Sequence, residues 1–168
     1  MTRNESHTTD LQRIIQTLPQ TGRVDWIGIR PQRDAPVQVV SEVMADITSG
    51  LSGDHYSKHD GSRQVTLIQA EHLSAVANFL QIEQVDPALA RRNIVVSGIN
   101  LLAFKDRQFR VGDVVLEMTG ICHPCTKLER HLGPGAYNAM RGHSGITAKI
   151  VRSGRIHIGD TVQLYLTV

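Results

Sequence analysis

The sequence is poor in cysteine and in aromatic residues, and it contains no long apolar run. Two cysteines among 168 residues, three positions apart, are too few for a disulfide framework and fit a reducing compartment. No stretch approaches the ~18 apolar residues that a membrane-spanning helix needs. The polar start, residues 1–7, has no apolar segment of signal-peptide length. The sequence therefore predicts a cytoplasmic protein that does not enter a membrane.

An excess of one charge is missing as well. Eighteen Lys and Arg against 16 Asp and Glu leave a net charge of +2, which is too small to indicate a nucleic-acid partner. The 40% apolar and 20% charged residues are ordinary for a globular protein. The length suits one domain with a substantial hydrophobic core.

Apolar periodicity divides the chain into a short N-terminal arm and a β-rich remainder. Leu11, Ile14, Ile15 and Leu18 recur at helical spacing, and Pro19 ends that helix. We therefore expect an arm or docking helix within residues 1–22 and one domain over residues 23–168. Strands are expected at 24–30, 37–43, 64–68, 94–96 and 109–116 and from 145 onward, and helices at 70–80, 86–90, 126–132 and 134–140.

Two segments resemble each other, at residues 109–116 and 156–164. Each has an apolar alternation, a Gly-Asp pair suited to a tight turn, and a second apolar alternation. We interpret both as strand–turn–strand elements of one barrel. At least seven short strands with few helices predict a mainly β fold, a closed or partly open β-barrel with short helices. A polar, glycine-rich loop is expected over residues 50–61.

The most reactive residue of the chain is predicted to be Cys125. It follows Pro124 and begins a predicted short helix, whose unpaired N–H groups favour a thiolate. Lys127 and His123 would favour the same charged form. A thiolate attacks electrophiles, carries sulfur or binds a soft metal. The alternative is a half-buried cysteine in a barrel loop.

Cys122 has several open interpretations: a resolving thiol, a persulfide partner or a plain buried residue. Zinc would need about four ligands. Cys122, Cys125, His131 and either His143 or His157 could supply them, but the histidines lack a paired spacing, so no zinc is expected.

Five motifs in a fixed order resemble the MOSC family, the C-terminal domain of molybdenum cofactor sulfurases, which also occurs as small stand-alone bacterial proteins. They are Gly50-Leu51-x-Gly53-Asp54, Arg91-x-Asn93-Ile94-Val95, Val111-Gly112-Asp113, Pro124-Cys125-x-Lys127-Leu128 and Gly154-x-Ile156-x-x-Gly159-Asp160-x-Val162. The resemblance implies a β-barrel that binds the molybdenum cofactor, Mo-molybdopterin, with no need for pyridoxal phosphate. Enzymatic relatives reduce N-hydroxylated compounds, and by position their metal ligand corresponds to Cys125.

The resemblance also implies roles for Arg91 and Asn93, and the chemistry of further residues predicts roles for Lys127, Asp54 and the histidines. Arg91 and Asn93 would bind the cofactor's phosphate and pterin, and Lys127 would contact the same anion. Asp54 would shape the pocket mouth or cap its own loop, and His123 or His143 would deliver protons. Arg92 is given no role of its own, because relatives can carry other residues there. Further cations that could line the entrance are Lys58, His59, Arg63 and Arg141.

Three functions remain open from the sequence. The first is a molybdenum-dependent reductase of a small N-hydroxylated substrate; a redox partner protein must then supply electrons, because the chain has no second cysteine cluster. The second is a sulfur carrier that uses a Cys125 persulfide. The third is a non-catalytic cofactor-binding or adaptor module. A homo-oligomer is compatible with all three.

Overall fold

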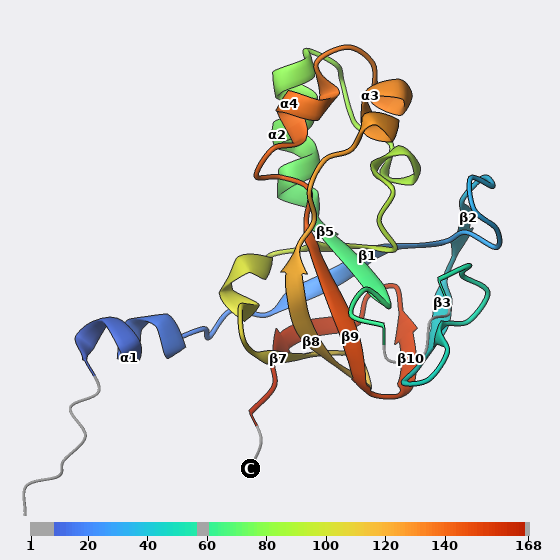
Figure 1. Ribbon diagram of the computed structural model, residues 1–168. Coiled ribbons are helices and arrows are strands. Elements are labelled where there is room, and N and C mark those ends of the chain that lie inside the picture. The colour runs from blue at the N-terminus through green and yellow to red at the C-terminus, as the bar shows by residue number, and fades with distance from the viewer. Residues whose placement is uncertain (1–8, 57–60, 167–168) are drawn as a thin grey trace, which may run out of the picture.

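The protein is mainly β, with a closed barrel, a small side sheet and a layer of short helices at one end of the barrel (Figure 1). The computed structural model describes residues 9–56 and 61–166. The barrel strands are β1 (Gly22–Ile29), β5 (Val65–Gln69), β6 (Ile94–Ser97), β7 (Gln108–Val111), β8 (Val114–Ile121), β9 (Ile146–Arg152) and β11 (Thr161–Leu164).

Pairing of the first and last strands closes the barrel. The order is β11-β7-β8-β9-β5-β6-β1, and Gly22 of β1 returns to Val162 of β11. Farther along, β1 pairs instead with β2 (Gln38–Val40). The side sheet consists of β3 (Glu42–Asp46), β4 (Gly50–Leu51) and β10 (Gly154–His157), in the order β10-β3-β4. The predicted barrel is confirmed, and it is closed.

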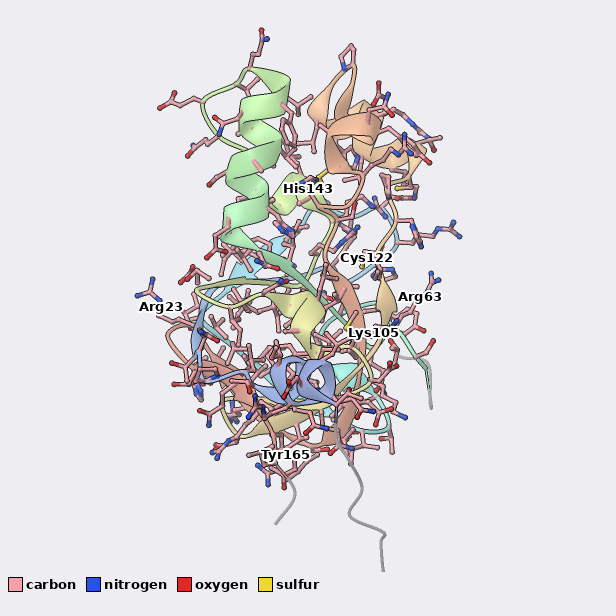
Figure 2. The ribbon with its side chains drawn as sticks, turned by 90° about the vertical axis from the view of Figure 1, so that its left-hand side faces the viewer. Arg23, Arg63, Lys105, Cys122, His143 and Tyr165 are labelled. Carbon is pink, nitrogen blue, oxygen red and sulfur yellow. The ribbon has the colours of Figure 1, made fainter. Side chains whose placement is uncertain are left out.

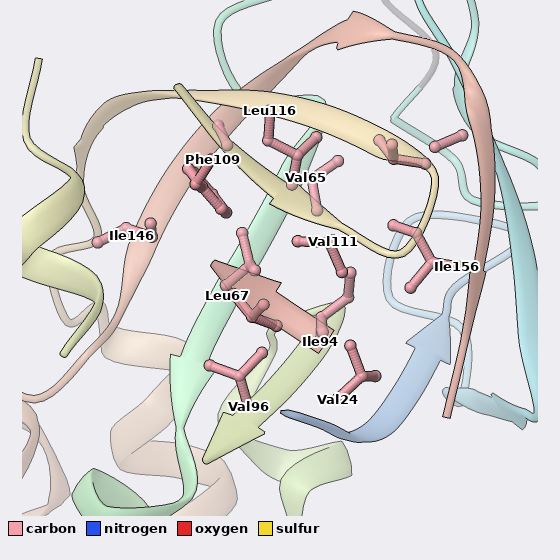
Figure 3. Close-up of a cluster of buried hydrophobic side chains, with 14 of the residues drawn as sticks. Val24, Val65, Leu67, Ile94, Val96, Phe109, Val111, Leu116, Ile146 and Ile156 are labelled. Atoms are coloured by element: carbon pink, nitrogen blue, oxygen red, sulfur yellow. The ribbon is translucent and has the colours of Figure 1, made fainter. Parts of the chain in front are cut away.

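Alternating apolar residues fill the barrel interior (Figure 3). Val65 and Leu67 of β5 point inward, as do Phe109 and Val111 of β7, and all four are fully buried. The ring of Phe109 stacks on that of Phe104, with centroids 4.3 Å apart. Burial at this level contributes roughly 1.5–3 kcal/mol per large side chain, so this core stabilises the barrel that carries the site.

A second core joins the barrel to the helices. The helices are α2 (Ala70–Leu80), α3 (Thr126–Leu132), α4 (Ala136–Met140) and the 3₁₀ helix η1 (Pro87–Ala90). Ile68 and Val95 face this layer, so β5 and β6 are buried on both sides. The register of β1 against β6 shifts between Val24 and Trp26. Val24 thereby faces the barrel and Trp26 packs against the helical layer.

The predicted helix at 70–80 is confirmed at both ends, and Leu73, Val76 and Ala77 form its buried face. The predicted helix at 126–132 is confirmed as α3. A second 3₁₀ helix, η2 (Leu101–Phe104), was not predicted. Within the described ranges no helix is long and apolar enough to cross a membrane.

Two predicted β segments are split between sheets. Residues 109–116 form the expected hairpin, but residues 156–164 do not: β10 pairs with β3, whereas β11 pairs with β7 and β1. The turn between β10 and β11 is bound to β1, since Gly159 N donates to Val24 O and Val24 N to Asp160 O. Residues 37–43 likewise divide into β2 and β3. The predicted loop at 50–61 begins as strand β4, and residues 57–60 lie outside the described ranges.

The N-terminal helix α1 (Asp10–Gln16) projects beside the barrel (Figure 1). Thr9 and Gln12 form a reciprocal capping box at its start. Leu11, Ile14 and Ile15 are largely exposed, and Arg107 Nη2 donates to Ile15 O at 2.8 Å. A docking role for this helix stays a prediction.

Substitution of Gly145 tests how closely the start of β9 packs against β5. Its φ is +85°, and a Cβ there would overlap the carbonyl oxygen of Leu67. Gly142 has φ +77° with nothing near its Cβ position. A left-handed backbone costs an L-residue about 1–2 kcal/mol and overpacking about 1–3 more. We expect Gly145→Ala to lose about 3 kcal/mol of unfolding free energy in urea, and Gly142→Ala about 1. Equal losses would contradict the close packing of Gly145.

His72 on α2 predicts a pH dependence of stability. Its Nδ1 is buried and has no hydrogen-bond partner among the described residues, and its ring lies edge-on to His143 with centroids 5.0 Å apart. Burial first, and then His143, lowers the pKa of His72 from 6.5, against a raising effect of Glu71. His72 makes its full contribution to the unfolding free energy above the pKa that it has in the unfolded state. That contribution is lost as the pH falls through the lower pKa of the folded state.

Unfolding free energies of the wild type should therefore decrease between pH 7 and pH 5, and His72→Gln should flatten that decrease. His131, an exposed residue of α3, provides the control, since His131→Gln should retain the wild-type slope. An unchanged slope in His72→Gln would show that another group causes the acid loss.

Candidate functional site

A cationic pocket, here called the arginine pocket, opens where the end of β1 meets the starts of β5 and β6. Its volume is about 230 Å³. These three strands are neighbours in the order β5-β6-β1. Because β5 runs parallel to β6 and β1 runs antiparallel to β6, the end of β1 lies beside the starts of β5 and β6. The lining residues are Gly28, Ile29, Arg30, Val37, Asp54, His55, Tyr56, Arg63, Thr66, Arg91, Arg92 and Asn93.

Asn93 links the three strands beneath this pocket. Its Oδ1 accepts from Thr66 N (3.1 Å) and Thr66 Oγ1 (2.9 Å), and its Nδ2 donates to Gly28 O (3.3 Å) and to Asp54 Oδ1 (3.4 Å). These four contacts occupy the ordinary capacity of an amide side chain. Asn93 therefore holds the pocket wall, and its predicted contact with a pterin stays a prediction.

Asp54 organises the loop that follows β4 and lines the same pocket. Its side chain is only 5% exposed. Oδ1 accepts from Arg30 N at 2.8 Å, and Oδ2 accepts from Tyr56 N at 3.2 Å. A buried carboxylate with backbone donors is well satisfied. Asp54 thus caps its own loop and lines the pocket as well.

The guanidinium groups of the pocket lie close enough to repel one another electrostatically. Burial, and then the charge of Arg91, lowers the pKa of Arg30, while Asp54 and Asp34 oppose that change. Arg91 itself has a left-handed backbone with φ +60° at the end of η1. Positive groups crowded around one buried carboxylate attract an anion, and guanidinium groups match phosphate geometry.

Arg92 extends this charge toward the cysteines. Its Nε donates to Ser144 O at 2.6 Å and its Nη1 to Arg91 O at 2.9 Å, so the side chain is fixed. Burial lowers the pKa of Arg92, and the charges of Cys122 and Cys125 oppose that shift. Arg92 therefore lines the arginine pocket and is bonded to Ser144, whose neighbour Gly145 is bonded to Cys122.

The residues Cys122–Cys125, here called the cysteine run, leave the end of β8 and enter α3. The last β8–β9 pair is Ile121 with Ile146, after which Cys122 N donates to Gly145 O at 2.9 Å. Both cysteines are free thiols. In Figure 2 Cys122 lies below the helical layer, in the same part of the molecule as Arg63.

The two thiols have different surroundings. Burial raises the pKa of Cys122, although Arg92 and Arg63 oppose the shift. Cys125 is exposed, and it is the N-cap residue of α3 without a side-chain capping bond. Cys125 is therefore the sulfur accessible to a metal or an electrophile.

Lys127 contacts the outer edge of the arginine pocket through a carboxylate. Its Nζ donates to Asp34 Oδ1, and the same oxygen lies 3.8 Å from Arg91 Nη1. The hydrogen bond from Lys127 lowers the pKa of Asp34 more than the nearby charges do. The loop after β1 is thereby joined to α3 and η1. A direct contact between Lys127 and a cofactor stays a prediction.

The structure brings three predicted site residues into one pocket and separates the two histidines. Arg91, Asn93 and Asp54 line the arginine pocket. His123 faces a different cavity beside β8. His143 packs against α2, with its ring 5.4 Å from that of Phe79 and its Nδ1 2.9 Å from Arg141 O. Of the other predicted cations, Arg63 lines the pocket, and Lys58 and His59 lie outside the described residues.

Arg30 and Arg92 were missed as site residues. Arg30 directly follows β1 and precedes Pro31, which is a common pattern without functional meaning, and the pairing of β1 with β6 brings it to the pocket. The position of Arg92 between two predicted cofactor-binding residues, Arg91 and Asn93, could have identified it as a site residue. Among residues 9–56 and 61–166, no three His, Cys, Asp or Glu side chains form a group that could hold a metal ion.

Solved structures of similar fold are known at low sequence identity. The YuaD protein from Bacillus subtilis is 18% identical with a TM-score of 0.75, and the match covers 87% of this chain and 97% of that one. YiiM from Escherichia coli is 20% identical with a TM-score of 0.65, over 87% of this chain and 71% of that one. YiiM from Geobacillus stearothermophilus is 15% identical with a TM-score of 0.67, over 86% and 75%.

These identities establish the shared fold and nothing further. A search of curated proteins found no match. A family model described as the MOSC domain matches residues 45–163, which include the cysteine run and the motifs around Asp54 and Arg91. With well over half of its length matched, the chain belongs to the MOSC domain family.

Proposed function

We propose that the protein binds the molybdenum cofactor and uses it to reduce N-hydroxylated compounds. The observation that carries the proposal is the arginine pocket, which Arg92 connects to the cysteine run through the segment Ser144-Gly145. The family generally binds this cofactor.

The chemistry of the residues fits the cofactor. Its phosphate is an anion, and the pocket offers the guanidinium groups of Arg30, Arg91 and Arg92. Cys125 offers an exposed sulfur at the start of α3, and sulfur ligands suit a redox-active transition metal. When bound, the cofactor supplies the two-electron redox chemistry that no side chain of the protein provides.

The reaction consumes two electrons and two protons. The N–O bond of R–NH–OH breaks. The nitrogen keeps its hydrogen and gains one proton to become R–NH₂, and the hydroxyl oxygen gains the other proton and leaves as water. A separate redox partner protein supplies the electrons. His123 is exposed within the cysteine run, and an imidazole can transfer protons near neutral pH.

The first test is the molybdenum and pterin content of protein from a cofactor-producing host. We expect near-stoichiometric metal and pterin in the wild type and loss of metal in Cys125→Ser, with reduction of N-hydroxylated compounds lost in parallel. Cys122→Ser is the matched control and should retain the metal, because Cys122 is half-buried with a raised pKa. Equal activity in Cys125→Ser would exclude the proposed ligand.

The exposed thiol of Cys125 also favours the second candidate, a sulfur carrier. Wild-type protein without molybdenum or pterin would direct attention to that function. Intact mass after incubation with a cysteine desulfurase would then reveal a sulfur adduct on Cys125. The absence of an adduct would argue against sulfur transfer.

The arginine pocket has its own test. Arg91→Gln removes a charge from the pocket and retains a side chain of similar length, so the pterin content should fall several-fold. Arg130 is an exposed arginine of α3, and Arg130→Gln should leave the content unchanged. Similar losses in both variants would indicate a general charge effect instead of a pocket contact.

A further inference from the structure

The carboxylate of Asp34 lies at the outer edge of the arginine pocket, on the loop between β1 and β2. Its Oδ1 accepts a hydrogen bond from Lys127 Nζ and lies 3.8 Å from Arg91 Nη1. The same charge also acts on Arg30, whose pKa it raises against the effects of burial and of Arg91. One carboxylate is therefore shared by cations that follow β1 and η1 and by a cation of α3.

The two carboxylates of this region are held in different ways. The side chain of Asp54 is almost fully buried, and it accepts hydrogen bonds from the backbone N–H groups of Arg30 and Tyr56. The side chain of Asp34 is 56% exposed, and the groups that attract it are the side chains of Lys127 and Arg91. Exposed ion pairs contribute little to stability because solvent screens them. Asp34 is therefore the carboxylate that can leave at small cost.

The loop that carries Asp34 can move without disturbing the barrel. Asp34 has a left-handed backbone with φ +64°, a conformation that recurs in switch segments, where surrounding contacts hold it. Pairing of β1 with β2 begins at Ile29 and Gln38, so residues 32–34, which are exposed, lie outside it. Figure 1 shows β2, at the far end of this loop, on the same side of the molecule as α3.

An anion in the arginine pocket would compete with Asp34 for the same cations. At 3.8 Å Arg91 attracts Asp34 without a hydrogen bond, so its donors stay available to a ligand. A phosphate bound there would lie within a few ångströms of the Asp34 carboxylate and would repel it. A phosphate dianion also offers more charge and more acceptor oxygens than one carboxylate. Lys127 donates to Asp34, so it can reach a ligand only after Asp34 has left.

We propose that Asp34 is a displaceable counter-ion of the arginine pocket. In the ligand-free protein it binds Lys127 and lies against Arg91, and the phosphate group of the ligand expels it and takes over both cations. The exchange makes the pocket selective, because a dianion compensates for the lost contacts and a monoanion such as chloride does not. This inference rests on the proposed function for the identity of the ligand, but not for the exchange itself.

Calorimetric titration with inorganic phosphate at constant ionic strength tests the competition, with protein from a host that cannot make the cofactor. Asp34→Asn removes the charge and retains the shape, so Kd should fall about fivefold, which is the effect in water of one charge about 4 Å away. Asp113 is an exposed aspartate outside the pocket that also pairs with an arginine, Arg110, at 3.5 Å. Asp113→Asn is the matched control and should leave Kd unchanged.

Three results of this titration would overturn the proposal. They are an equal Kd in the wild type and Asp34→Asn, an equal decrease in both variants, and no phosphate binding in any of the proteins.

Carbodiimide coupling shows whether Asp34 actually leaves. The reagent joins a paired carboxylate and amine as an amide and takes up the elements of water. Phosphate should suppress the cross-link between Asp34 and Lys127, measured by mass spectrometry of peptides, and chloride at the same ionic strength should not. Glu117 and Lys149 form a pair at 2.9 Å on the barrel, and their cross-link is the internal control that phosphate should not change. A yield for Asp34 and Lys127 that saturating phosphate leaves constant would contradict the expulsion.

These measurements need neither molybdenum nor pterin, so the two proposals can fail separately. Wild-type protein from a cofactor-producing host that lacks both, while phosphate expels Asp34, would refute the proposed function and support the counter-ion. Protein that binds the cofactor and reduces N-hydroxylated compounds, with equal phosphate Kd in Asp34→Asn and the wild type, would refute the counter-ion alone.

Discussion

The amide of Asn93 is the contact on which the arrangement of the site depends. A single side chain satisfies backbone groups at the ends of β1 and β5 and also reaches the carboxylate of Asp54. Removing a partner from such a network leaves buried polar groups unpaired, which costs about 1–3 kcal/mol for each group. Because the pocket wall and the barrel end share this amide, the geometry of the pocket is coupled to the stability of the barrel.

The barrel end presents different chemistry on the two sides of the cysteine run. Toward the starts of β5 and β6, arginine side chains surround Asp54. Toward η2, the walls are apolar and their charges balance. The strand order explains this separation, since β5 and β6 lie on one side of β9 and β8 lies on the other. The two cavities at this end of the barrel therefore differ in the chemistry of the ligands that they suit.

Local pattern predicted most elements of the fold but not all of their partners. The helix at 70–80 was predicted at both ends because apolar spacing specifies a helix within one segment. The segment 156–164 was misassigned because its strands pair with β3 and β7, a choice fixed by long-range bonds from the Gly159-Asp160 turn to Val24. The convergence of Arg91, Asn93 and Asp54 followed from ordered motifs, whereas Arg30 required the strand pairing itself.

The crowding of the arginines has a consequence for how long the folded protein persists in a cell. Each guanidinium that lowers its neighbour's pKa raises the free energy of the folded state, and a shared anion removes that repulsion. Any anion that binds only the folded chain then adds to its stability by mass action. Occupancy of the pocket and resistance to proteolysis should consequently vary together. A cell that contains little of such an anion would contain less of the protein, even at a constant rate of synthesis.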